Sequence, residues 1–313
     1  MEARHRRTAA RPLELGALVA ALALALSAAA CGGGDPYAEA APACSYVSSG
    51  TAIWKPDGLP DGTPPTAWQG SSSLKPECKA VLEKLLPFDG SWTDAPDGLK
   101  DRVMEAFQAL LAYPLALPNE NRIFGVAPWS YPLGFIVEIQ RDETPMKSLF
   151  NHALSVVDTL HRVPSLGQKS AQWTPDDYVL LWNGVLTIAD SFADLGQNPF
   201  FTTPIQRASI LVHEAHHGDG YFHHPCGDER GWECDFDLNG PFGYAALYDV
   251  MALHGSASFL SDDDIRFLFA QACSKLKTRF NHLPPDLQAT VDAISGCWDF
   301  SADDIAALEG LKR

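Results

Sequence analysis

Apolar residues recur at three- and four-residue intervals along most of the chain after residue 75, which is the pattern of amphipathic helices. Three of the predicted helices begin where threonine precedes proline, at Thr144, Thr174 and Thr203. Threonine is a favoured N-cap and proline a favoured first helical residue, so these pairs support helix starts. The helices predicted in this way cover residues 76–86, 97–113, 144–163, 174–196, 202–220, 241–255, 261–280, 284–295 and 301–312.

Strand patterns are few. The segment GFIVEIQ at residues 134–140 is the best candidate, and RIFGV at 122–126 is a shorter one, because both are rich in β-branched and aromatic residues. The predicted fold class is therefore mainly α with a small β-sheet, in one domain over residues 75–313. Residues 31–74 are rich in glycine, proline and serine, which predicts a tether with local turns. Cys44 indicates that part of this tether is held against the domain.

The first thirty residues have the pattern of an export signal. Four arginines precede ALVAALALALSAAA, an apolar run that is short for a membrane span, so residues 1–30 are predicted to be a cleaved signal peptide. The run SAAAC followed by GGGD resembles the lipobox of bacterial lipoproteins, with Ala28 in place of the usual leucine. The resemblance implies lipid attachment at Cys31 and a place at the bacterial cell envelope, on the outer membrane or the periplasmic face. Plain secretion is the alternative.

The charge balance argues against nucleic acid as a partner. The whole chain has a net charge of −16, and loss of residues 1–30, with four arginines and two glutamates, leaves −18. Phosphate backbones repel such a chain. The residues that remain are enough for one substantial core, and we expect a monomer.

Six cysteines remain when Cys31 is set aside, an even number that predicts three disulfides in an oxidising compartment. Many pairings are open to six cysteines. Sequential pairing is favoured because each bond then closes a short or moderate loop, which gives Cys44–Cys78, Cys226–Cys234 and Cys273–Cys297. Zinc binding is the alternative for the middle pair.

Residues able to bind a metal or transfer a proton are most concentrated in HEAHHGDGYFHH, residues 213–224. His213 and His217 are four residues apart on a predicted helix, so both imidazoles face the same side and can reach one ion. Zinc suits imidazole ligands, and a site with three ligands leaves a position for water. Glu214 lies at the edge of that face, where it can take a proton from the water, whose pKa zinc lowers towards ~7.

The run HEAHHGDGYFH matches H-E-x-x-H-x-x-G-x-x-H throughout and resembles the metzincin branch of the zinc metallopeptidases, the zincins. The resemblance implies a zincin-like domain with this motif on its central helix. It implies zinc ligands at His213, His217 and His223, with Glu214 as general base in peptide hydrolysis. It also implies that Gly220 permits the sharp turn that returns His223 to the metal.

The third ligand has two rivals. His224 follows His223 directly, and Glu233, with Asp237 four residues further on, resembles the downstream glutamate of the gluzincin branch. Glu233 is predicted to lie on a loop before the 241–255 helix, and this favours His223.

Two features depart from the metzincin pattern. Metzincins carry a methionine turn beneath the zinc, whereas Met251 lies in the predicted 241–255 helix, where core packing is the favoured interpretation. Zincins also place a substrate-pairing edge strand shortly before the active helix. Here two predicted helices separate the 134–140 strand from the 202–220 helix.

Other polar residues near the motif are expected to be neighbours of the site. His216 points ~100° away from the ligand face and is expected at the surface or behind a ligand. The candidates for hydrogen bonds to the ligand imidazoles are Asp219, Asp235 and Asp237, with solvation as the alternative. The candidates for stabilising an oxyanion are Tyr221, Tyr244 and Tyr248, with aromatic packing as the alternative.

These features together predict an exported, membrane-anchored, zinc-dependent metallopeptidase. Its partners would be a peptide or protein substrate and, through Cys31, a membrane. The alternative is a non-catalytic cell-envelope lipoprotein, a scaffold or binding module, in which the histidines hold a structural metal. Hydrolysis of another amide, such as a cell-wall amide, needs the same zinc chemistry and stays open.

Overall fold

The structure is a computed structural model of the chain. It describes residues 35–44, 74–113, 115, 145–167, 169–176, 183–193, 204–227, 232–256, 260, 262–293 and 296–297. The predicted signal peptide, Cys31, the predicted strands at 122–126 and 134–140, and the predicted helix at 301–312 lie outside these residues. Within them, no helix combines the length and apolar character needed to cross a bilayer.

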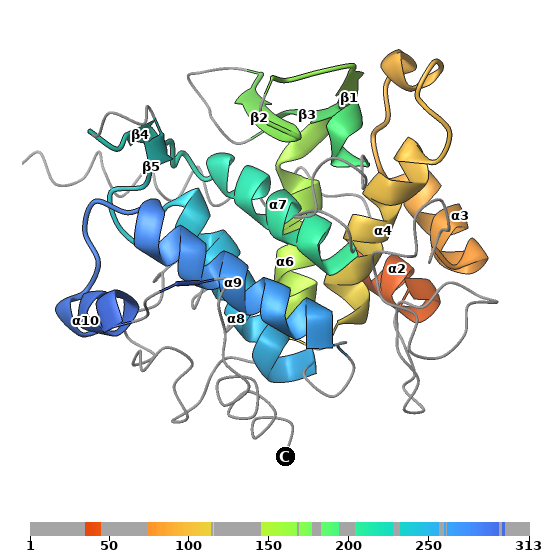
Figure 1. The fold of residues 1–313 in the computed structure, drawn as a ribbon. Helices are drawn as coiled ribbons and strands as arrows, with labels where there is room; N and C mark the ends of the chain where they lie inside the picture. Colours follow the sequence, from red (N-terminus) through yellow and green to blue (C-terminus); the bar gives the residue numbers. More distant parts are fainter. Residues whose placement is uncertain are drawn as a thin grey trace, which may run out of the picture.

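The described residues are mainly helical and carry a small sheet, as predicted (Figure 1). The helices are α2 (Pro36–Cys44), α3 (Pro76–Leu85), α4 (Leu99–Ala112), α6 (Pro145–Ser155), α7 (Pro204–His217), α8 (Pro241–Ser256), α9 (Asp262–Thr278) and α10 (Pro285–Ala293), with 3₁₀ turns η2 (Gly90–Trp92) and η5 (Asp190–Phe192). The strands are β1 (Val157–Val163), β2 (Ala171–Pro175), β3 (Gly184–Ala189), β4 (His224–Pro225) and β5 (Glu233–Cys234).

Two of the predicted helices are corrected by the structure. The helix predicted at 144–163 ends at Ser155, and the chain continues as β1. The helix predicted at 174–196 is wrong, because its described residues form the end of β2, then β3 and η5. Thr174 and Pro175 therefore end a strand instead of beginning a helix. The fixed φ of proline suits the first turn of a helix, but it is also tolerated at the edge of a sheet.

These strands form a three-stranded sheet in the order β1-β3-β2. The middle strand, β3, pairs in parallel with β1 and antiparallel with β2. Along β3 the side chains of Leu186 and Ile188 are buried, while Val185 and Thr187 between them are half-buried. This period of two, in a segment rich in β-branched residues, is the strand pattern that the helical interpretation of residues 174–196 missed.

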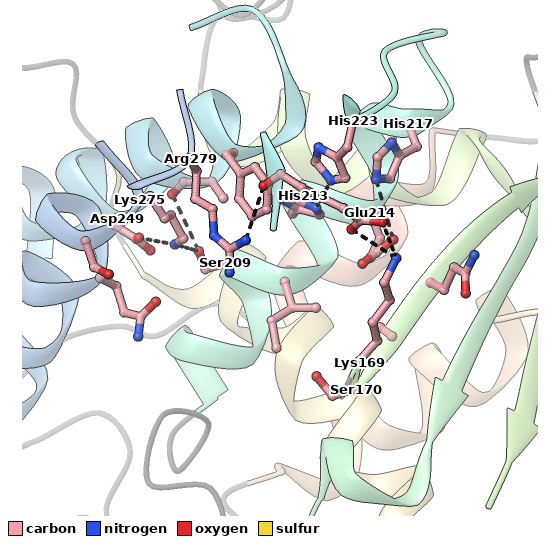
Figure 2. Close-up of a pocket in the computed structure, with 18 of the residues that line it drawn as sticks. Lys169, Ser170, Ser209, His213, Glu214, His217, His223, Asp249, Lys275 and Arg279 are labelled. Carbon is pink, nitrogen blue, oxygen red and sulfur yellow. Dashed lines mark hydrogen bonds and ion pairs between the residues drawn. The ribbon is translucent and has the colours of Figure 1, made fainter. Parts of the chain in front are cut away.

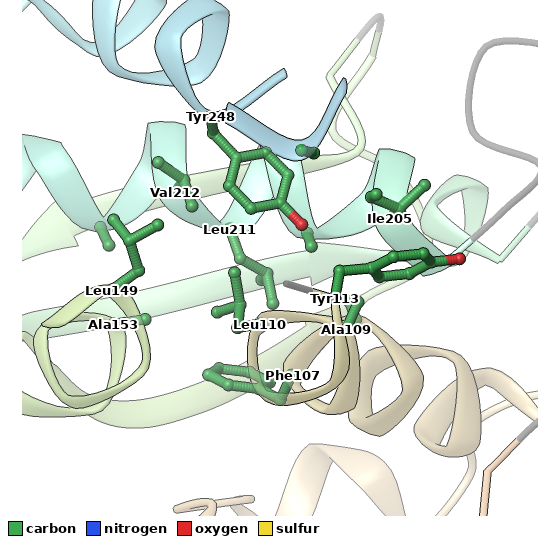
Figure 3. Close-up of a cluster of buried hydrophobic side chains, with 14 of the residues drawn as sticks. Phe107, Ala109, Leu110, Tyr113, Leu149, Ala153, Ile205, Leu211, Val212 and Tyr248 are labelled. Carbon is green, nitrogen blue, oxygen red and sulfur yellow. The ribbon is translucent and has the colours of Figure 1, made fainter. Parts of the chain in front are cut away.

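Helix α7 packs mainly against α4, α6, α8 and β2. Its apolar residues Ile205, Leu211 and Val212 are buried and meet side chains from the neighbouring helices (Figure 3). The α4 side of this cluster includes Phe107 and Leu110, which are also buried. Packing on several sides fixes the position of α7, and therefore of the histidines near its C-terminal end.

A buried ion pair also joins α7 to α4. Arg207 donates from Nη2 to Oε2 of Glu105 at 2.7 Å, and neither side chain is exposed to solvent. Arg102 donates to the same carboxylate at 2.9 Å from one turn earlier on α4. Burial lowers the pKa of Arg207 to about 10, which still leaves it charged at neutral pH beside Glu105.

The three predicted disulfides are all present, as Cys44–Cys78, Cys226–Cys234 and Cys273–Cys297. The first joins α2 to α3, and α2 also contacts α4 and α6. The disulfide and these contacts hold α2 against the helices that follow residue 75. Three disulfides are compatible with a protein exported to an oxidising compartment.

Candidate metal centre

Three histidines come together at the C-terminal end of α7. His213 and His217 lie one turn apart on the helix, with ring centroids 5.3 Å apart. His223 comes from the segment after the helix, and its ring centroid lies 4.9 Å from that of His213 and 4.8 Å from that of His217. One ligand atom from each residue lies within 4.8 Å of the others, so the group can hold a metal ion (Figure 2).

A tight turn brings His223 back towards the helix. Backbone bonds from the amide of Gly218 to Ala215 O and from that of Gly220 to His217 O close the last turn of α7. Gly220 has φ of +84°, in the left-handed region that favours glycine. The chain then reverses, and Nε2 of His223 lies 3.0 Å from Nε2 of His213.

Hydrogen bonds orient two of the three imidazole rings. His217 donates from Nδ1 to the carbonyl oxygen of Tyr221 at 2.7 Å, and His223 donates from Nδ1 to Oδ1 of Asp235 at 2.8 Å. Both partners are acceptors, so each neutral ring carries its lone pair on Nε2, the atom a metal would use. Burial lowers the pKa of His213 well below its usual value and that of His217 to about 4, which keeps the neutral, ligating forms.

Asp235 is the buried anchor of this arrangement. While Oδ1 accepts from His223, Oδ2 accepts from the backbone N–H of Phe242 at 2.7 Å and of Gly243 at 3.3 Å. These amides belong to the first turn of α8, which has no intrahelical acceptors for them. One carboxylate therefore fixes a ring of the metal site and caps a helix.

We expect Asp235→Asn to lower the affinity for zinc, used as the probe ion, about 10–100-fold. An asparagine can accept from His223 or from the first turn of α8, but its NH₂ group faces a donor at the other position. Competition with a chromophoric chelator measures the affinity. Asp237→Asn is the matched control, because Asp237 accepts from Asn239 at 2.8 Å and contacts none of the three histidines. Equal affinities for the two variants would contradict the role of Asp235.

Glu214 lies beside the histidines and is buried. Its Oε2 accepts from the backbone N–H of Trp173, on β2, at 2.8 Å and lies 4.0 Å from Nε2 of His217. Burial raises the pKa of Glu214 to about 7, although the Trp173 N–H opposes this shift. The carboxylate is thus held at one fixed position next to the metal group.

A cavity of about 730 Å³ opens onto the three histidines and Glu214. Its walls come from the segment Lys169–Trp173, from α7, α8 and α9, and from residues directly before β4 and at the start of β5. Cavities of this size accept small ligands or several side chains of a larger one. The contribution of β2 to this wall was not predicted, because its residues were divided between a loop and a helix.

The two alternative third ligands, Glu233 and His224, lie outside the group of three histidines. Glu233 is exposed on β5 and pairs with Lys169 at 3.1 Å, and Nε2 of His224 receives a hydrogen bond from Asn281 at 2.7 Å. Neither belongs to the group of converging ligand atoms among the described residues. The geometry therefore favours His223.

The remaining neighbours are packed against one another. His216 is buried, not at the surface, and bonds to Asp219 at 2.6 Å and to the carbonyl oxygen of Asn239 at 2.6 Å. Its ring stacks on Tyr244 and Tyr221. Tyr248 and Met251 are fully buried in the core, as their packing interpretations predicted. None of the three candidate tyrosines lines the cavity, which favours aromatic packing as their role over stabilising an oxyanion.

No protein-family model, curated protein or solved structure matched this chain.

Proposed function

We propose that the protein is an exported, zinc-dependent metallopeptidase of the zincin type. The observation that carries the proposal is the convergence of His213, His217 and His223 at the wall of an open cavity, with Glu214 beside them. A structural zinc is closed by four protein ligands, whereas a catalytic zinc has three and keeps a position for water. Three histidines beside a cavity fit the second arrangement better than the non-catalytic alternative.

Each residue has a chemical part in this proposal. Zinc bound by the three imidazoles would supply a Lewis acid that activates water and polarises a carbonyl. Glu214 would accept the proton of the attacking water and return it to the leaving amine. The Trp173 N–H holds the carboxylate of Glu214 in place for both transfers. Asp235 orients His223 and increases its basicity as a ligand.

The sheet offers a place for a peptide backbone. Among the described residues β2 lies at one edge of the sheet, and its residues Ala171–Trp173 line the cavity. An extended peptide can add to such an edge through backbone hydrogen bonds. In this proposal β2, which contacts α7, is the edge strand that pairs with the substrate. The predicted strand at 134–140 was too distant from α7 in sequence for this role.

Export and anchoring belong to the same proposal. The signal-like residues 1–30 would direct export, and lipid attached at Cys31 would anchor the mature chain to the cell envelope. The disulfides are compatible with this compartment.

Metal content and peptide hydrolysis test the proposal together. We expect one zinc ion per purified chain by elemental analysis, and cleavage of unfolded casein that stops with a chelator and returns with zinc.

His223→Ala should lose the zinc, because only two of the three imidazole ligands remain. The matched control is His224→Ala, which should retain it, since His224 is bonded to Asn281. A parent chain without zinc, or zinc lost from the control and kept in the first variant, would overturn the metal site. Stoichiometric zinc without hydrolysis of any peptide would favour the non-catalytic alternative.

A further inference from the structure

We infer that the part of the cavity enclosed by α7, α8 and α9 is a side-chain pocket that selects a carboxamide, the group carried by glutamine and asparagine. The inference rests on the proposed peptidase function, because it concerns the substrate residue bound next to the metal centre. Three side chains define this amide pocket, one from each helix, namely Ser209, Asp249 and Lys275.

The three residues form a connected polar group beside the metal centre. Lys275 makes an ion pair with Oδ2 of Asp249 and donates to Oγ of Ser209 at 3.1 Å. His213 also lines the cavity, and Figure 2 places it between this group and His217. A side chain entering the amide pocket would therefore belong to a residue close to the bond that is cleaved.

One oxygen of Asp249 lacks a hydrogen-bond partner. The side chain is fully buried, and Oδ1 has no donor among the described residues. Buried carboxylate oxygens normally accept hydrogen bonds, and leaving one without a donor is unfavourable. Asp249 lines the cavity, so a donor group of a bound ligand can form a hydrogen bond to its Oδ1. The pocket is thus built to receive an N–H or O–H group.

The charges around Asp249 restrict which donor fits. A cationic side chain would approach the ammonium group of Lys275, which already neutralises Asp249. An anionic side chain would face the carboxylate of Asp249, and an apolar one would leave its Oδ1 unpaired. A carboxamide can donate from its NH₂ group to Asp249 and accept from Lys275 with its oxygen.

The surrounding lining is consistent with a neutral polar ligand. Arg279, another cation that lines the cavity, lies over the rings of Trp232 and Phe242 and donates to the carbonyl oxygen of Glu233 at 3.2 Å. These contacts hold the guanidinium group of Arg279 against the cavity wall. Other amide and hydroxyl side chains line the same region, namely Gln206, Gln271, Ser274 and Thr278.

Binding of matched peptides tests the inference without relying on catalysis. The probes are dye-labelled hexapeptides of alanine that differ at one central position, which is Gln, Glu, Met or Lys. Their affinities for the zinc-loaded Glu214→Gln protein are measured by fluorescence anisotropy. We expect the Gln peptide to bind at least about ten times more tightly than the other three, because an unpaired buried polar group disfavours each of them. Equal affinities for the four peptides would overturn the inference.

Variants of the amide pocket link this preference to the residues named. In the same protein, Asp249→Leu combined with Lys275→Met makes the pocket apolar, and the preference should pass from the Gln peptide to the Met peptide. Asp249→Asn, a smaller change, should reduce the Gln preference even if the double variant fails to fold. The matched control replaces the partly exposed pair Lys79 and Asp101, which lies outside the cavity lining, by Met and Leu and should leave the order of affinities unchanged. A Gln preference that survives Asp249→Asn would contradict the pocket.

The two proposals fail in different ways. If the Gln peptide binds with the expected preference but the parent protein cleaves none of the four peptides, the peptidase function is wrong and the amide pocket stands. If the parent cleaves all four equally well, the pocket is wrong and the peptidase function stands. If no peptide is bound or cleaved, both are wrong.

Discussion

Glu214→Gln is expected to keep the zinc content and the fold of the parent while it lowers kcat for peptide hydrolysis about 10²–10⁴-fold. Glutamine has the shape of glutamate, and its amide oxygen can still accept from the Trp173 N–H that holds the side chain against β2. It cannot accept a proton from the attacking water. Loss of rate without loss of metal would therefore separate proton transfer from metal binding.

The measurement combines zinc analysis of the purified variant with kcat on a peptide that the parent cleaves. Glu233→Gln is the matched control, since Glu233 also lines the cavity but is exposed and paired with Lys169. That control should retain most of the activity. Undiminished hydrolysis by Glu214→Gln would rule out Glu214 as general base, and loss of zinc from the same variant would point to a role in the metal site itself.

The second large effect concerns stability. Glu105→Leu should lower the free energy of unfolding by about 3–5 kcal/mol, because it leaves the guanidinium of Arg207 buried without its carboxylate. Arg207 is fully buried in α7, so water cannot take the place of Glu105. Urea denaturation followed by circular dichroism gives the free energy. Adding Arg207→Met to the same chain should recover part of the loss, since the fully buried uncompensated charge is then removed while Arg102 still lacks its partner.

An exposed ion pair on α4 provides the comparison. Asp101 pairs with Lys79 of α3 at 2.7 Å, and both side chains are partly open to solvent. Asp101→Asn should lower the free energy of unfolding by at most about 1 kcal/mol, because solvent screens such pairs. A similar effect of Asp101→Asn and Glu105→Leu would contradict the view that burial makes the Glu105–Arg207 pair structurally important.

The parts of the site that follow from local geometry were predictable from the sequence. His213 and His217 are one helical turn apart, so a correct prediction of α7 was enough to bring their rings to one face. The turn at Gly220 and the return of His223 were instead implied by the resemblance of the run to the metzincin motif. The disulfides were predictable for a similar reason, since each joins cysteines that are close in sequence.

The positions of β1, β2 and β3 were missed because local signals were ambiguous. Thr174 and Pro175 satisfy the rules for a helix start, yet they end an edge strand, and only the pairing of β2 with β3 decides between the two. Apolar residues in a short segment fit a period of 3.6 almost as well as a period of 2. The strand assignment depends on neighbours that the local sequence does not reveal.

The partners of the site residues were missed because they are distant in sequence. The Trp173 N–H that holds Glu214 comes from 41 residues earlier, and Lys275 meets Asp249 across 26 residues. Asp235 was among three candidate acids, and only the structure distinguishes it from Asp219 and Asp237. Spacing along a chain does not specify such contacts.

The double contact of Asp235 links metal binding to the position of α8. The same carboxylate holds His223 and the first amides of that helix, so any ligand that fixes one of them restricts the freedom of the other. Helix α8 also carries Asp249, which lines the same cavity as the three histidines. Because linkage between binding sites is reciprocal, any factor by which an occupied metal centre changes the affinity of the amide pocket for substrate equals the factor by which bound substrate changes the affinity for the metal.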